Sequence, residues 1–161
     1  MYMAEEIERK FLLKNDTWRS LARSSARYRQ GYLASRREVV VRVRLSDDTA
    51  FLTIKGEANG IRRLEYEYPL PIVDAEEMLD LLCERPLIEK ERFFVPYGDH
   101  LWEVDVFAGD NAGLVLAEVE LQDPDEVFVR PPWVGEEVSE DPRFYNANLV
   151  KYPFKSWSTD G

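Results

Sequence analysis

The sequence predicts a mainly β fold of the α+β class: an eight-stranded antiparallel sheet closed into a barrel, with a few flanking helices. Two observations predict it. About eight short stretches alternate in character from residue to residue and are separated by turn-forming residues, which is typical of hairpin-connected strands. In most of these stretches one face is apolar and the other heavily charged. A closed barrel uses both, with the apolar face outward under the helices and the charged face lining the interior.

The first half of the chain predicts five of these strands and one helix. In residues 5–13, Glu6, Glu8 and Lys10 fall on one strand face and apolar residues fall on the other. The sequence after this strand is typical of a helix start, and we expect a short helix from Asn15-Asp16-Thr17 to about Ser25. Further strands are predicted at 29–34, 39–45, 49–55 and 62–70.

The second half predicts a longer helix, three strands and a short terminal helix. Asp74-Ala75-Glu76-Glu77 is typical of a capping box with Asp74 as the cap, and Pro86 ends the apolar helix that follows. Strands are predicted at 87–96, 101–107 and 115–121, and a short helix within 142–150. No repeat or linker divides the chain, so we expect a single domain over residues 1–161.

Composition argues against several classes of function. The net charge of −10 is unsuited to general nucleic-acid binding. Cys83 is the single cysteine and His100 the single histidine, which excludes an intramolecular disulfide and argues against zinc sites and histidine-based catalysis. The first six residues contain no basic segment leading into an apolar one, and no apolar run reaches 18 residues. We therefore expect a cytoplasmic protein with no membrane or nucleic-acid partner, and leave open whether it forms a homodimer.

The charged strand faces would converge inside the barrel. Buried unpaired charge costs several kcal/mol per ion, so such an interior needs mutual pairing, water or a charged ligand. The cations suit a polyanion, and carboxylates without His or Cys partners suit Mg²⁺ or Mn²⁺. A metal–polyphosphate complex would satisfy both sets. The cations are Lys10, Arg42, Arg44, Lys55, Arg63, Lys90 and Arg92, and the acids are Glu6, Glu8, Glu65, Glu67, Glu103, Asp105, Glu118 and Glu120.

A charged strand face is more often solvated than functional. The same-sign pairs Arg42/Arg44 and Glu118/Glu120 argue against that interpretation here, because a solvated face gains nothing from neighbours of like charge. A ligand or a metal would compensate them.

These clusters resemble the CYTH family, the triphosphate tunnel metalloenzymes, which includes class IV-type adenylate cyclases, thiamine triphosphatases, inorganic triphosphatases and RNA 5′-triphosphatases. The family signature Glu-x-Glu-x-Lys corresponds to Glu6-Ile7-Glu8-Arg9-Lys10. The likeness is greatest to short bacterial inorganic tripolyphosphatases, and it implies an eight-stranded antiparallel tunnel. Further blocks that resemble the family follow in the expected order over nearly the whole chain: 30–33, 41–44, 52–56, 63–67, 89–93, 102–107 and 117–121.

The resemblance also implies roles for individual residues. Tyr32 would pair with Lys55 as a catalytic dyad that assists proton transfer, although an aromatic packing at the barrel rim would explain Tyr32 equally well. Glu65 and Glu67 are lining acids without an assigned role. Triphosphate would be bound by Lys10, Arg42, Arg44, Lys55, Lys90 and Arg92, with Arg63 as a further lining cation. Metal ions would be held by Glu6, Glu8, Glu118 and Glu120, with Asp105 and Glu103 next in line.

The expected function is metal-dependent hydrolysis of inorganic triphosphate to pyrophosphate and phosphate. An adenylate cyclase or a thiamine triphosphatase on the same fold is the first alternative. We expect Trp102 and Trp133 in outer packing, although either would offer thiamine an aromatic surface at the tunnel mouth. A non-catalytic module that binds polyphosphate or nucleotide is the alternative from another class.

Overall fold

The computed structural model describes residues 4–159 and contains one antiparallel sheet of nine strands within that range. The first three residues, which entered the expectation about the start of the chain, lie outside it, as do the last two. The strands are β1 (Glu5–Leu13), β2 (Ser24–Ser35), β3 (Val39–Leu45), β4 (Ala50–Gly56), β5 (Arg62–Pro69), β6 (Ile88–Tyr97), β7 (His100–Phe107), β8 (Val115–Glu120) and β9 (Val134–Glu137).

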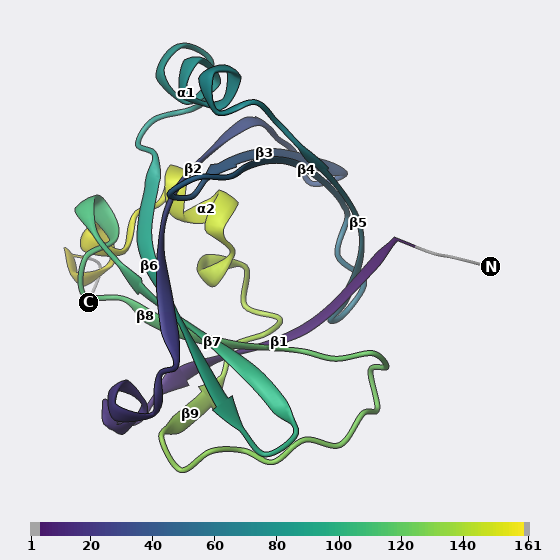
Figure 1. Cartoon of the computed structure of the whole chain (residues 1–161), viewed down its shortest axis with the longest axis vertical. Coiled ribbons are helices and arrows are strands. Elements are labelled where there is room, and N and C mark those ends of the chain that lie inside the picture. The colour runs from purple at the N-terminus through teal and green to yellow at the C-terminus, as the bar shows by residue number, and fades with distance from the viewer. Residues whose placement is uncertain (1–3, 160–161) are drawn as a thin grey trace.

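Eight of these strands form a ring, as Figure 1 shows. Their order is β5-β4-β3-β2-β6-β7-β8-β1, and pairing of β1 with β5 closes it. Strand β1 achieves this by changing partners along its length: residues 5–7 pair with β5 and residues 8–11 pair with β8. The predicted antiparallel ring is confirmed. Strand β9, which extends the sheet beside the end of β1, was not predicted, because four residues containing a glycine show too little alternation.

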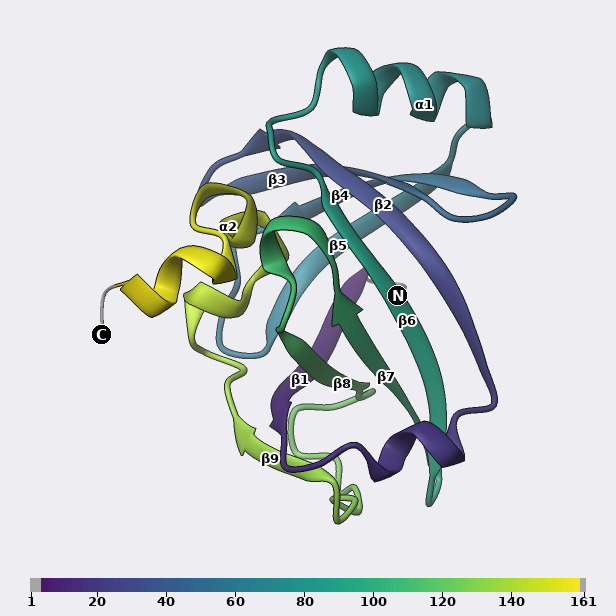
Figure 2. The ribbon, with the colours of Figure 1, turned by 90° about the vertical axis from the view of Figure 1, so that its left-hand side faces the viewer.

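The apolar strand face lies on the outside of the ring, under the helices. Helix α1 (Ile72–Leu81) crosses the outer surface of β2, β3 and β4, as Figures 1 and 2 show. Its Ala75 and Leu79 pack on Val43 and Ala50. Pro71, not Asp74, occupies the capping position, so the predicted capping box is wrong and Asp74 lies in the first helical turn. Within residues 4–159, no helix combines the length and the apolar character that crossing a bilayer requires.

The C-terminal segment closes one end of the ring. Helix α2 (Asn146–Lys151) lies at this end, visible through the ring in Figure 1. Its Leu149 and Val150 pack in one cluster with Tyr32 of β2 and Leu116 of β8. The charged interior therefore has an apolar floor.

Strand β2 differs most from its prediction. It begins at Ser24, where the sequence predicted the end of a helix, and the helix itself is a single 3-10 segment over residues 17–21. Residues 24–30 form a continuous ladder with β6. This long-range pairing outweighs the weak local helix signal, and the N-cap residue Asp16 makes no side-chain capping bond.

Candidate active site

The ring encloses a cavity of about 750 Å³ into which the predicted charged side chains point. All seven predicted cations line it, and so do seven of the eight predicted acids. The eighth, Asp105, is buried behind the lining. The sequence pattern therefore located the interior face of nearly every strand.

Strand register explains why these side chains meet. Residues directly opposite in an antiparallel pair point to the same face. Lys10 on β1 is opposite Glu118 on β8, which is opposite Glu103 on β7. On the other side of the tunnel, Arg42 and Glu67 flank Thr53, whose hydroxyl accepts a bond from Arg42 and donates one to Glu67.

Asp105 holds two cations in place. Its carboxylate accepts hydrogen bonds from Lys90 Nζ at 2.7 Å and from Arg92 Nε and Nη2 at 2.7 and 2.9 Å. Burial raises the pKa of Asp105, but Arg92 and then Lys90 outweigh it and hold the pKa well below its usual range. Asp105 thus orients Lys90 and Arg92, and its role as a metal ligand stays a prediction.

Lys55 lies between two carboxylates. Its Nζ is 3.0 and 3.1 Å from the oxygens of Glu6 and 3.3 Å from Glu65. Burial raises the pKa of Glu6, yet the Lys55 ammonium lowers it to about 2. Burial and then the charge on Glu6 raise the pKa of Glu65 to about 7. Of the two carboxyl groups, Glu6 therefore ionises first and Glu65 keeps its proton to higher pH.

Positive charge is in excess near Arg44. Burial lowers the pKa of Arg44, and Arg42 and Arg92 lower it further, to about 10. The guanidinium stacks on the Tyr28 ring, 4.6 Å from its centroid. Crowded guanidinium groups of this kind are relieved by an anion that accepts several hydrogen bonds.

Negative charge is in excess at Glu8. Burial raises its pKa, and Glu118 and Glu6 raise it further, well above the usual range. In the described part of the chain, neither Glu8 nor the facing Glu120 takes part in an ion pair, whereas Glu118 lies 3.6 Å from Lys10 and 3.5 Å from Arg92. Oxygen ligands short of a cation suit a hard divalent ion. Within residues 4–159, no three acidic, histidine or cysteine side chains are close enough together to form a ready metal site. Glu6 and Asp105 form ion pairs with lysines instead.

The predicted Tyr32–Lys55 pair is not formed. Tyr32 is almost fully buried between the tunnel and its apolar floor, and its hydroxyl accepts a bond from Gln30 at 3.3 Å. Arg63 is only partly available to a ligand in the tunnel, because it donates two hydrogen bonds to the carbonyl of Gly56 in its own hairpin.

Two polar residues of the site were missed by sequence reasoning. Gln30 is fully buried and bonds to Arg44 and to Asn146. Its position two residues before Tyr32 places it on the same strand face, so strand parity would have identified it. Asn146 accepts a bond from Lys90. Nothing in the sequence pattern marked Asn146, because its contact depends on where the C-terminal segment folds back.

Trp102 and Trp133 lie in outer packing, as expected, and not at the tunnel mouth that the thiamine alternative needed. Trp102 and Trp133 are fully buried in the outer core, with ring centroids 5.7 Å apart. Neither lines the cavity, so the predicted aromatic surface for thiamine is wrong.

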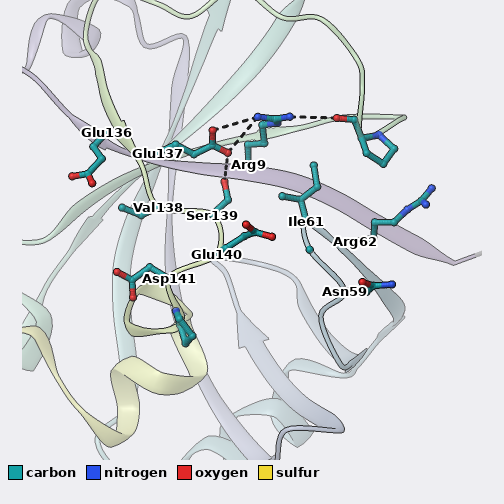
Figure 3. Close-up of a pocket in the computed structure, with 13 residues that line it drawn as sticks. Arg9, Asn59, Ile61, Arg62, Glu136, Glu137, Val138, Ser139, Glu140 and Asp141 are labelled. Atoms are coloured by element: carbon teal, nitrogen blue, oxygen red, sulfur yellow. Dashed lines mark hydrogen bonds and ion pairs between the residues drawn. The ribbon is translucent and has the colours of Figure 1, made fainter.

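A second, more open pocket of about 1090 Å³ lies beside the tunnel (Figure 3). It is bounded by the turn at 59–62 and by residues 136–142, and Arg9 pairs with Glu137 at one edge. Its acids belong to loops and to β9, and none of the predicted site residues lines it.

Comparison with known proteins agrees with this geometry. The model of the CYTH domain family matches residues 4–145. An inorganic triphosphatase of Acetivibrio thermocellus is 49% identical over 155 residues, 96% of this chain and 99% of that protein. An inorganic triphosphatase of Nitrosomonas europaea is 39% identical over 149 residues, 90% of this chain and 96% of that protein.

Solved structures also match the fold of this chain. The crystal structure of the inorganic triphosphatase NE1496 matches with a TM-score of 0.65 and 35% identity, covering 93% of this chain and 97% of that one. A putative adenylyl cyclase from Hippeastrum with a dominant triphosphatase activity shares the fold, with a TM-score of 0.59, 13% identity, and coverage of 74% and 81%. The chain belongs to the CYTH family.

Proposed function

We propose that this chain is a metal-dependent triphosphatase that hydrolyses inorganic triphosphate to pyrophosphate and phosphate within the tunnel. The observation that carries the proposal is the convergence of all seven predicted lysine and arginine side chains, among others, on one cavity of about 750 Å³. Such a set neutralises a compact polyanion, and arginine forks match its phosphoryl oxygens. Two relatives named inorganic triphosphatase, at 49% and 39% identity, support this substrate.

In this proposal, Lys90 and Arg92 bind the substrate in orientations fixed by Asp105. Arg42 and Arg44 contribute from β3, and Lys10 from β1. Because these groups are held before substrate arrives, they stabilise charge on the transferred phosphoryl group and on the leaving pyrophosphate without reorganising. Lys55 and Arg63 complete the substrate-binding set.

We assign a divalent ion, Mg²⁺ or Mn²⁺, to the acidic side of the tunnel. Metal dependence is general among CYTH triphosphatases. Glu8 and Glu120 would hold the ion, with Glu118 and Glu6 contributing. When bound, it would neutralise phosphate charge and polarise phosphoryl oxygens. The fit rests on Glu8, whose carboxylate is crowded by like charge.

Hydrolysis joins a water oxygen to the terminal phosphorus and breaks that phosphorus's bond to the bridging oxygen, so pyrophosphate leaves. Water gives up its proton in this exchange, and the leaving group needs charge neutralisation or a proton. Tyr32 and Lys55 are the proposed proton-handling and charge-stabilising groups. Both line the cavity, although their side chains are not bonded to each other.

The test measures phosphate release from inorganic triphosphate, ATP and thiamine triphosphate in parallel, with Mg²⁺ or Mn²⁺. Lys10→Ala removes a buried tunnel cation, and Lys14→Ala is the matched control because Lys14 is exposed outside the tunnel. We expect preference for inorganic triphosphate, loss of at least about 100-fold in Lys10→Ala, and no change in Lys14→Ala. Cyclic AMP with pyrophosphate from ATP, or tight binding without turnover of any substrate, would replace the proposal with a cyclase or a binding module.

The proposal treats residues 1–161 as one catalytic domain that works in the cytoplasm on a small anionic substrate. It requires no nucleic acid, membrane or second copy of the chain.

A further inference from the structure

Two side-chain amides, the buried Gln30 and the half-buried Asn146, connect the cations of the tunnel to Tyr32 and to its floor. Gln30 lies on β2 and Asn146 begins α2, 116 positions later in the chain. Gln30 Oε1 accepts a bond of 2.9 Å from Arg44 Nε. Gln30 Nε2 donates to Asn146 Oδ1 at 3.1 Å and to Tyr32 Oη at 3.3 Å. Asn146 Oδ1 also accepts a bond of 3.0 Å from Lys90 Nζ.

The cations fix the direction of both amides. Arginine and charged lysine have donors and no acceptors, so the group facing each must be an oxygen. Arg44 therefore sets Gln30 Oε1 on its side and turns Gln30 Nε2 toward Tyr32. The remaining N–H of Gln30 then points to Asn146, which must present Oδ1 to it, and this oxygen also accepts the bond from Lys90. Reversing either amide would bring two donors together.

This order has a consequence for Tyr32. Its oxygen accepts a hydrogen bond from Gln30, so its own proton must point to a different partner. Among the hydrogen bonds of the described residues, the Tyr32 hydroxyl donates none, and Tyr32 lines the tunnel cavity. The O–H is therefore available to a phosphoryl oxygen in the tunnel.

We infer that Gln30 and Asn146 are positioning residues that make Tyr32 a hydrogen-bond donor to the bound triphosphate while aligning Arg44 and Lys90. This rests on the proposed function of the tunnel and goes beyond it, because it gives Tyr32 a direction. It also explains why α2 must dock for the site to be complete: the helix supplies the Asn146 oxygen that two tunnel residues share.

The variants separate the two bonds of Gln30. Gln30→Glu keeps an acceptor for Arg44 but replaces the donor toward Tyr32 with a second acceptor. The Tyr32 proton then bonds to the new carboxylate and is lost to the substrate. Gln30→Met removes both bonds at similar volume. Gln122→Met is the matched control, since Gln122 is exposed on the loop after β8. Asn146→Asp keeps the shared acceptor, whereas Asn146→Leu removes it.

We expect Gln30→Glu to lower kcat by about 10-fold or more with KM changed less than about 3-fold, since the lost bond acts on the transition state. Gln30→Met should lower kcat and raise KM, and Gln122→Met should do neither. Asn146→Asp should stay within about 3-fold of the parent protein, while Asn146→Leu should lose about 10-fold. In a Tyr32→Phe background, Gln30→Glu should cost nothing further in kcat, because the two changes remove one interaction.

Additive losses in the double variant, or an unchanged kcat in Gln30→Glu, would overturn the inference. Thermal melting shows whether a variant loses activity only because it unfolds. If a Gln30 variant does so, the comparison of Asn146→Asp with Asn146→Leu tests the inference instead. If the parent protein releases no phosphate, the proposed function fails separately. Calorimetric binding of inorganic triphosphate then takes the place of kcat, and the same non-additivity between Gln30 and Tyr32 is expected in the dissociation constant.

Discussion

Glu8 and Glu120 lie directly opposite each other across the β1–β8 pair, and neither takes part in an ion pair within the described residues. Like charges directly opposite in a sheet are destabilising. Here burial and the charges of Glu118 and Glu6 raise the pKa of Glu8 well above its usual range. The fold thus keeps carboxylates close together whose repulsion lowers its stability, and a bound divalent cation would remove this repulsion.

The first prediction concerns Glu8→Gln. Without divalent ions this variant should melt about 2–4 °C higher than the parent protein, roughly 1 kcal/mol, because it removes a poorly compensated charge. Adding Mg²⁺ or Mn²⁺ should raise the Tm of the parent protein by preferential binding to the folded state, and should not raise that of Glu8→Gln. Differential scanning calorimetry measures both effects.

The control for Glu8 is Glu38→Gln, which changes an exposed glutamate in the β2–β3 turn. It should keep the full metal-induced shift. An equal shift in Glu8→Gln and Glu38→Gln would remove Glu8 from the proposed ligand set.

The second prediction concerns Asp105→Asn. Removing one partner of a buried ion pair leaves the others uncompensated, and we expect a loss of about 3–5 kcal/mol in the free energy of unfolding. Lys90 and Arg92 would also lose their shared acceptor, so triphosphate binding should weaken. Urea unfolding measures the first effect and calorimetry the second. Asp99→Asn, in an exposed turn, should change neither.

Asp105 also predicts a pH dependence. Its pKa is lower in the folded protein than the unfolded value of about 3.9, so the folded state binds fewer protons there and stability rises with pH. The contribution is complete above about pH 4 and is lost as pH falls through the lower, folded pKa. Below pH 4 the free energy of unfolding should therefore fall less steeply in Asp105→Asn than in the parent protein. Parallel slopes would contradict the assignment.

The ring and its interior face could be predicted from sequence because both depend on a short-range pattern. Alternation along β1 alone separates Glu6, Glu8 and Lys10 from the outer core. Antiparallel register then brings such faces together without further information. The ends of elements were less predictable. Strand β2 begins five residues before its predicted start because its N-terminal part pairs with β6, a partner more than sixty residues away.

Pairing inside the tunnel could not be predicted, because it depends on distances between strands far apart in sequence. Strand parity places Asp105 and Glu103 on one face, but only the fold shows that Asp105 is buried behind Lys90 and Arg92. Asn146 shows the same limit more strongly, since its role depends on the docking of α2. Outer packing of Trp102 and Trp133 could be expected from the sequence, whereas the contact between their rings required the register of β7 and the path of the chain before β9.

The third prediction separates two arginines that the sequence treated alike. Arg63 donates to the Gly56 carbonyl through Nε and Nη2, whereas Arg42 is buried and bonds to Thr53 within the tunnel. Arg42→Ala should raise the KM for triphosphate by at least about 10-fold, and Arg63→Ala by less than about 3-fold. Steady-state phosphate release measures both. Equal effects would mean that Arg63 leaves its hairpin carbonyl when substrate binds.

The last prediction concerns the floor of the tunnel. Leu149 has no exposed surface and packs with Leu116 and Tyr32, so Leu149→Ala should cost about 2–5 kcal/mol through the cavity it creates. Leu81→Ala is the matched control, because Leu81 is 77% exposed at the end of α1 and should cost less than about 0.5 kcal/mol. Amide hydrogen exchange should also speed up in α2 of Leu149→Ala more than in β3 or β4, since the helix depends on this contact while the ring has its own ladder. A loss below about 1 kcal/mol with unchanged exchange in α2 would show that the helix is held by the polar contacts of Asn146 to Gln30 and Lys90 instead.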